Sequence, residues 1–173
     1  MKTSRVLTIL AVALSSAGLF AQRENIAGIR NFIKVDGAAA CGGSTEPSAV
    51  AELAKRGYKG IVSLREDGET GAQNAEMEQA ARAAGVRFVH VPMSAQSPND
   101  ASAAAALSAI RDGGNQPVFL YDASGSRAAA IWMIKRMLYD GWAEDRAYSE
   151  AVSIGLASPS LKAFAIDYVS RHK

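Results

Sequence analysis

Short apolar runs alternate along the chain with longer, alanine-rich segments, and this alternation restricts the folds that the sequence can adopt. Five runs have the length and composition of buried strands: residues 31–35, 38–41, 60–64, 86–91 and 117–121. Helical periodicity or helix-start signals mark six further segments: residues 45–57, 72–84, 97–111, 128–139, 145–154 and 158–171. Strands separated by helices pair in parallel and are covered on both faces. The sequence therefore predicts an α/β fold with a central, mostly parallel sheet of four to five strands flanked by helices.

The first 21 residues have the pattern of a secretory signal peptide. Lys2 and Arg5 precede an apolar run at residues 6–20, and Ala21 supplies a small residue at the cleavage edge. A retained amino-terminal anchor is the alternative. We expect one domain of ordinary length over residues 22–173, located in the periplasm or secreted.

The charge balance gives no sign of a polyanionic partner. Removal of Lys2 and Arg5 with the signal segment leaves 17 basic and 17 acidic side chains in the remaining chain. We therefore expect no binding to nucleic acid, and no membrane association after signal cleavage. Cys41 is the only cysteine, so no internal disulfide can form, and its small apolar neighbours predict a buried thiol.

The last predicted strand leads into a loop of small residues that ends in an arginine. Residues 117–127 read Pro-Val-Phe-Leu-Tyr-Asp-Ala-Ser-Gly-Ser-Arg. The loop residues Ala123, Ser124, Gly125, Ser126 and Arg127 lie at the start of a helix, where backbone N–H groups and a guanidinium favour an anion. A plain strand-to-helix turn, with a serine cap, is the alternative. The position beyond the carboxyl end of a parallel strand favours a binding site.

These segments together resemble a known family, the bacterial branch of the dual-specificity, tyrosine-phosphatase-like superfamily. That branch includes the phosphatase-like domains fused to β-lactamase-like hydrolases. The resemblance covers roughly residues 31–138 and rests on residues 42–47, which are similar to a Gly-Gln-Pro turn, on residues 61–69 and 89–92, and on the loop. It implies a cysteine-phosphatase-like fold and a site for phosphate monoesters.

The chain departs from the family signature at the residue that performs covalent catalysis. The signature His-Cys-x-x-Gly-x-Arg falls on residues 121–127, where Gly125 and Arg127 match but Tyr121 and Asp122 replace histidine and cysteine. A carboxylate is a much poorer nucleophile toward phosphorus than a thiolate. We expect Asp122 to occupy the pocket and pair with Arg127, which leaves a self-satisfied loop that binds phosphate weakly.

The general acid that the resemblance implies is also missing. Family members carry an aspartate on the loop after an earlier strand, but residues 92–98 contain no acidic side chain. Asp100 is the nearest candidate acid. Its spacing from Ser97, with Pro98 between them, is instead typical of a capping box. The acidic segment 66–69, with Glu66, Asp67 and Glu69, either borders the same cleft or forms a solvated loop.

Two functions follow from these residues. The first is a secreted pseudophosphatase that binds or regulates an unknown protein partner or a phosphorylated or anionic ligand, with no cofactor and no metal. The second is an active phosphoric monoester hydrolase with Asp122 as nucleophile, assisted by Mg²⁺ as in haloacid-dehalogenase-type enzymes. Lys135 matches the lysine of those enzymes or, equally well, belongs to a solvated helix face.

Overall fold

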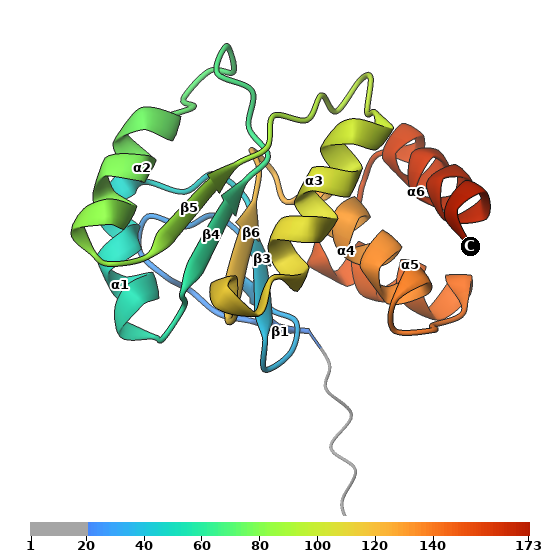
Figure 1. The fold of residues 1–173 in the computed structure, drawn as a ribbon, viewed down its shortest axis with the longest axis horizontal. Helices are drawn as coiled ribbons and strands as arrows, with labels where there is room; N and C mark the ends of the chain where they lie inside the picture. Colours follow the sequence, from blue (N-terminus) through green and yellow to red (C-terminus); the bar gives the residue numbers. More distant parts are fainter. Residues whose placement is uncertain (1–20) are drawn as a thin grey trace, which may run out of the picture.

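The computed structural model describes residues 21–173 and shows a central sheet between two layers of helices (Figure 1). Apart from Ala21, the predicted signal peptide lies outside the described residues. The strands are β1 (Gln22–Arg23), β2 (Ile33–Lys34), β3 (Ala39–Gly42), β4 (Gly60–Ser63), β5 (Arg87–His90) and β6 (Val118–Tyr121). The α-helices are α1 (Val50–Lys55), α2 (Asn74–Ala83), α3 (Asp100–Arg111), α4 (Ser126–Leu138), α5 (Glu144–Ile154) and α6 (Pro159–His172), and two 3₁₀ turns are η1 (Pro47–Ala49) and η2 (Gly113–Asn115).

The sheet has the strand order β1-β2-β3-β6-β4-β5. The last four strands in this order run parallel, and β1 and β2 are antiparallel to their neighbours. The prediction of a mostly parallel α/β sheet is confirmed, but the number of strands is six and not four to five. The added strand, β1, consists of two exposed residues, Gln22 and Arg23, so no apolar run marks it in the sequence.

The central strands are buried on both faces of the sheet. In β6, Phe119 and Tyr121 pack into the core beneath α1 and α2, whereas Val118 and Leu120 pack into the core beneath the other helices. Figure 1 shows α1 and α2 on one side of the sheet and α3 to α6 on the other. This two-sided burial explains why β6 reads as a continuous apolar run and not as an alternating one.

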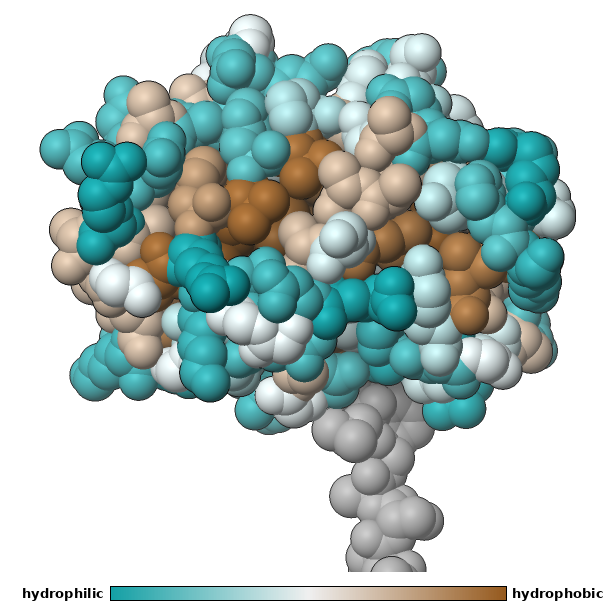
Figure 2. Space-filling model, viewed as in Figure 1, coloured by the Kyte–Doolittle hydropathy of each residue, from teal (hydrophilic) through white to brown (hydrophobic). Residues whose placement is uncertain are grey.

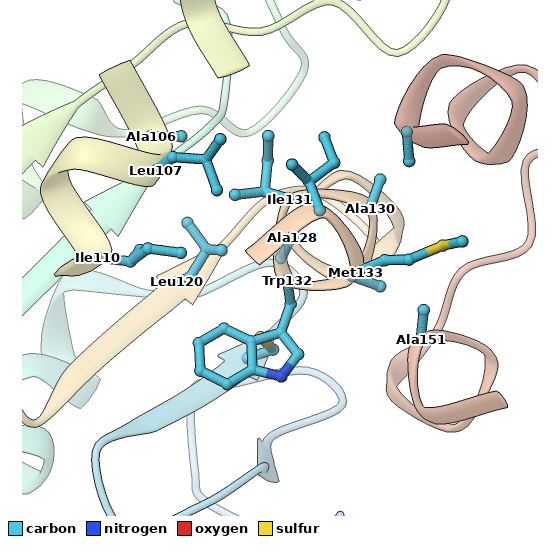
Figure 3. Close-up of a cluster of buried hydrophobic side chains, with 14 of the residues drawn as sticks. Ala106, Leu107, Ile110, Leu120, Ala128, Ala130, Ile131, Trp132, Met133 and Ala151 are labelled. Atoms are coloured by element: carbon cyan, nitrogen blue, oxygen red, sulfur yellow. The ribbon is translucent and has the colours of Figure 1, made fainter. Parts of the chain in front are cut away.

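Helix α4 runs through the middle of the larger core. Its side chains are buried around almost the whole circumference. Figure 3 shows Ala128 and Ala130 on this helix among the side chains of Leu120 and Ala151. Small residues at these positions allow the sheet, α5 and α6 to approach the helix closely. The helix that follows the loop is therefore fixed from all sides, and its first turn is a rigid base for the site.

Hydrophobic residues also reach the surface. On the face seen in Figure 2 they form a band across the middle of the molecule, between hydrophilic margins. Among the described residues, the exposed large hydrophobic side chains are those of Tyr139 and Val152. Within residues 21–173, no helix combines the length and the hydropathy needed to cross a bilayer.

Candidate functional site

The loop between β6 and α4 lies at the carboxyl end of the parallel strands. Because β6 has a parallel neighbour on each side, residues 122–125 lie at the middle of this edge. Gly125 is the N-cap of α4 and has φ of 98°, a backbone conformation that favours glycine. A Cβ atom on Gly43 would lie 3.2 Å from the carbonyl carbon of Ser124, so the neighbouring turn also approaches the loop closely.

The loop curls around the carboxylate of Asp122, a residue that is only 1% exposed. Oδ1 accepts hydrogen bonds from the backbone N–H groups of Ser124 (2.6 Å) and Gly125 (2.8 Å). Oδ2 accepts a third from the N–H of Ala128 (2.9 Å). These donors belong to the loop and to the first turn of α4, where the helix dipole favours negative charge. The chain's own carboxylate therefore takes the place of an external anion at these three groups.

The carbonyl groups of the loop point away from Asp122. The carbonyl of Ala123 accepts hydrogen bonds from the backbone N–H (3.1 Å) and the hydroxyl (2.9 Å) of Ser44. The carbonyl of Ser124 accepts one from Nδ2 of Asn31 (3.4 Å). A loop whose amide groups point inward and whose carbonyl groups point outward has the arrangement of an anion-binding nest. The N–H of Ser126 donates to Oγ of Ser124 (3.3 Å) and not to the carboxylate.

The guanidinium of Arg127 is held mainly by groups outside the loop. Nη1 donates to the carbonyls of Leu64 (3.2 Å) and Met93 (2.7 Å), and both Nη atoms bind the carboxylate of Glu69, with Nη2 at 2.8 Å. Nε lies 4.0 Å from Oδ1 of Asp122 and makes no hydrogen bond with any residue between 21 and 173. The expected pairing of Asp122 with Arg127 is thus a long contact, and Glu69 is the close partner.

Glu69 belongs to the acidic segment between β4 and α2, and it borders the pocket. Its carboxylate also accepts hydrogen bonds from the N–H of Glu66 (3.0 Å) and from Nε of Arg65 (3.2 Å). Partial burial raises the pKa of Glu69, but the hydrogen bonds from Arg127, from the N–H of Glu66 and from Arg65, together with the charge of Arg127, outweigh it and lower the pKa to about 2. Glu69 is therefore a carboxylate at any ordinary pH.

A pocket of about 270 Å³ opens above the loop. Its polar lining comes from Glu66, Glu69, Gln96, Ser124, Ser126 and Arg127. The carboxylates of two glutamates in the wall and of Asp122 beneath the loop outnumber the two guanidinium groups that bind Glu69, those of Arg127 and Arg65. A like charge about 4 Å from an incoming phosphate costs on the order of 4 kcal/mol at an effective dielectric near 20. The charges of this pocket thus disfavour a phosphate dianion.

Asp100, the predicted candidate acid, does not line the pocket. Its carboxylate binds the guanidinium of Arg171 on α6, with Oδ1 at 2.9 Å from Nη2. This contact lowers the pKa of Asp100. The predicted capping box is wrong, because Oδ1 of Asn99 accepts the hydrogen bond from the N–H of Ser102 (2.9 Å) and caps α3. Asp100 therefore joins two helices.

The remaining candidates lie away from the loop. Lys135 donates to Oδ2 of Asp140 (2.8 Å), near the other end of α4. Cys41 is fully buried, and this burial together with nearby carboxylates raises the pKa of its thiol well above the usual range. Among residues 21–173, no group of three His, Cys, Asp or Glu side chains is arranged to hold a metal ion.

Comparison with protein families identifies one match. The model of the phosphatase-like domain of β-lactamase hydrolase-like proteins matches residues 32–138, more than half of the chain. A search of curated proteins finds no match. The matched segment begins before β2 and ends with α4, so it contains the loop, Glu69 and the pocket.

Solved structures with the same fold include proteins described as phosphatases. A putative phosphatase from Shewanella putrefaciens CN-32 superposes with a TM-score of 0.70 at 17% identity, covering 83% of this chain and 92% of that one. The core catalytic domain of the PP-IP phosphatase SIW14 from S. cerevisiae gives 0.69 at 19%, covering 86% and 93%. TpbA from P. aeruginosa gives 0.67 at 21%, covering 90% and 91%. At these identities the likeness concerns the fold, which is that of the cysteine phosphatases.

Proposed function

Because the chain belongs to the phosphatase-like domain family of β-lactamase hydrolase-like proteins, and because a carboxylate fills its loop, we propose that it is a pseudophosphatase with a binding or regulatory role. The observation that carries the proposal is the set of three backbone N–H groups bound by Asp122. These groups would otherwise be available to a phosphate. A nucleophile engaged in this way, and buried beneath a pocket that two glutamates line, is poorly placed to attack phosphorus.

The missing acid supports the same proposal. Residues 92–98 contain no acidic side chain, and the Met93 carbonyl in this segment accepts a hydrogen bond from Arg127. Asp100 is bound to Arg171. A leaving oxygen would therefore have to depart without the protonation that an aspartate supplies in active relatives, which typically contributes 10²–10⁴-fold in rate.

Hydrolysis of p-nitrophenyl phosphate, with and without Mg²⁺, tests the proposal. We expect no turnover from the wild type and none from Arg127→Ala. Asp122→Cys restores a thiolate, whereas Asp122→Ser only removes the carboxylate charge. Comparing the hydrolysis rates of these two variants separates the two effects. Activity in Asp122→Cys alone supports the proposal, whereas Mg²⁺-dependent turnover by the wild type that Asp122→Asn abolishes would establish the active hydrolase instead.

We also propose that the protein acts outside the cytoplasm, with residues 1–21 as a cleaved signal. The support is the order of the residues: Lys2 and Arg5 come first, an apolar run follows, and Ala21 comes after it. Expression of the full chain in a bacterium, followed by osmotic-shock release and amino-terminal sequencing, tests this. A periplasmic product that begins at Gln22 is expected. A product that keeps its first residues and stays with the membrane fraction would show an anchor instead.

A further inference from the structure

The first strand of the sheet begins at the proposed signal-cleavage point. A cut after Ala21 makes Gln22 the first residue of the mature chain, and Gln22 is also the first residue of β1. A glutamine at an amino terminus has a free α-amino group, and its own side-chain amide carbon lies within reach of that nitrogen through a five-membered ring. The mature terminus therefore carries both partners of an intramolecular reaction.

The side chain of Gln22 is free to take part in such a reaction. It is exposed and makes no hydrogen bond with any residue from 21 onward. The two charged residues that follow it are bound elsewhere. Nη1 of Arg23 donates to Oδ1 of Asn31 (3.0 Å), and the carboxylate of Glu24 accepts from Nη1 of Arg56 (2.6 Å). Neither neighbour therefore holds the Gln22 amide away from the terminal nitrogen.

The sheet fixes the chain just beyond the reacting residue. Strand β1 lies at the end of the sheet and pairs with β2 alone, with Gln22 opposite Lys34. The N–H of Glu24 donates to the carbonyl of Phe32 (3.1 Å), so the ladder remains anchored there. The Gln22 side chain can therefore bend back to its own nitrogen without an opening of the fold.

We infer that Gln22 of the secreted protein is modified to pyroglutamate, the cyclic lactam of glutamine. The inference goes beyond the proposed binding role and rests on the proposed signal cleavage. The α-nitrogen attacks the side-chain amide carbon, and the new C–N bond closes the ring. The bond from that carbon to the amide nitrogen breaks, and ammonia leaves with a proton from the α-nitrogen. No oxidant, reductant or cofactor takes part.

The modification changes the chemistry of the mature terminus. It removes the positive charge that a free amino group would place opposite Lys34, and like charges directly opposite each other destabilise a strand pair. It also removes the primary amine that aminopeptidases recognise. Because chain ends are where proteolysis concentrates, the lactam protects the two residues of β1 from stepwise removal.

The intact mass of the protein tests this inference. The full chain is expressed in a bacterium, recovered by osmotic shock and measured on isolation and after prolonged incubation at neutral pH. We expect the mass of residues 22–173 less one molecule of ammonia, and tandem mass spectrometry should place the loss at Gln22. The matched control is Gln22→Asn, which keeps the amide but would need a strained four-membered ring, so it should retain its full mass.

The outcomes separate this inference from the proposal on which it rests. A wild-type product that starts at Gln22 and keeps its full mass after incubation would overturn the inference alone. A product that retains residues 1–21, or that starts at another residue, would overturn the proposed cleavage as well. The pseudophosphatase proposal depends on hydrolysis by Asp122 variants and is untouched by either result.

The rate of ammonia loss tests the structural part of the inference. Protein with a free Gln22 terminus, released from a fusion partner by a protease, is compared with a synthetic peptide of residues 22–30. The two rates should agree within about threefold, because no opening of the fold has to precede the reaction. A protein that cyclises more slowly than this would show that the fold shields Gln22, and would overturn the inference.

Discussion

Helix α4 carries two buried arginines that bind carboxylates in different surroundings. Arg136 forms a bidentate pair with Glu150 of α5, with Nε at 2.8 Å and Nη2 at 2.9 Å. Nη1 of Arg136 binds Asp140 (2.8 Å), and Nε1 of Trp132 donates to the same Glu150 carboxylate (3.0 Å). Arg127, in contrast, binds a glutamate that lies on a loop and lines an open pocket.

The difference concerns what can replace each carboxylate. Glu150 is held by a helix, its side chain is 8% exposed, and its partners enclose it. The Glu69 side chain is 21% exposed and its pair is open to water on one side. Removing one partner from an enclosed ion pair leaves a buried, uncompensated charge, whereas water or a ligand can compensate at a pocket. The Arg136 pair thus stabilises the fold, and the Arg127 pair shapes the site.

The largest loss of stability is expected when Arg136 is replaced. Arg136→Ala removes the partner of Glu150 and should lower the free energy of unfolding by about 3–5 kcal/mol, the range for breaking a buried pair. Urea denaturation measures this change. The matched control is Lys135→Ala, which removes a contact with the same Asp140 from the outer side of the helix and should cost less than about 1 kcal/mol. Equal losses in both variants would contradict the comparison.

A smaller loss of stability is expected when Asp122, at the centre of the loop, is replaced. Asp122→Asn keeps the shape and one oxygen, but its NH₂ group then faces a backbone N–H, and the charge at the start of α4 disappears. The free energy of unfolding should fall by about 2 kcal/mol, since a hydrogen bond to a charged group contributes about 1.5–3 kcal/mol.

Asp112→Asn is the control for Asp122→Asn. Asp112 caps the turn η2 from the surface, with Oδ1 accepting from the N–H of Gly114 (2.8 Å). Asn and Asp are nearly equal as caps, so no measurable loss is expected there. An unchanged stability in Asp122→Asn would show that the loop does not depend on the charge of this carboxylate.

Sequence patterns predicted the loop and its surroundings because their signals are local. The buried strand before Asp122, the small residues after it and the arginine at the helix start are contiguous, so their position at the sheet edge follows from the α/β alternation. The two-residue strand β1 carries no such signal. It exists because it pairs with β2, a tertiary contact that a run of two exposed residues does not reveal.

The partners of the charged side chains could not be predicted in the same way. Glu69 binds Arg127 across 58 positions of the sequence, and Asp100 binds Arg171 across 71. Nothing in the local pattern separates a glutamate that borders the pocket from its solvated neighbours. The useful signal was the position of the acidic segment just after β4, because the carboxyl ends of β4 and β6 meet at the same edge.

Glu69→Gln should have a smaller effect on stability than either buried substitution. The amide keeps the shape of the side chain, and Arg127 keeps its contacts with two backbone carbonyls, so we expect a loss of about 1 kcal/mol or less in urea denaturation. Glu66→Gln is the control, since Glu66 lines the same pocket but its side chain makes no hydrogen bond with any residue in 21–173. A loss at Glu69 as large as at Arg136 would remove the distinction between the two pairs.

The pH dependence of Glu69 gives the smallest expected effect. Its pKa is about 2 in the folded protein and 4.5 for the ordinary side chain, so the unfolded chain binds the proton more readily. The stabilisation is complete above pH 4.5 and is lost as the pH falls toward about 2. The difference in unfolding free energy between the wild type and Glu69→Gln, which cannot titrate, should therefore shrink over this range in urea titrations. A difference that stays constant would mean that Arg127 does not depend on the charge of Glu69, and that its two backbone carbonyls are sufficient to hold it.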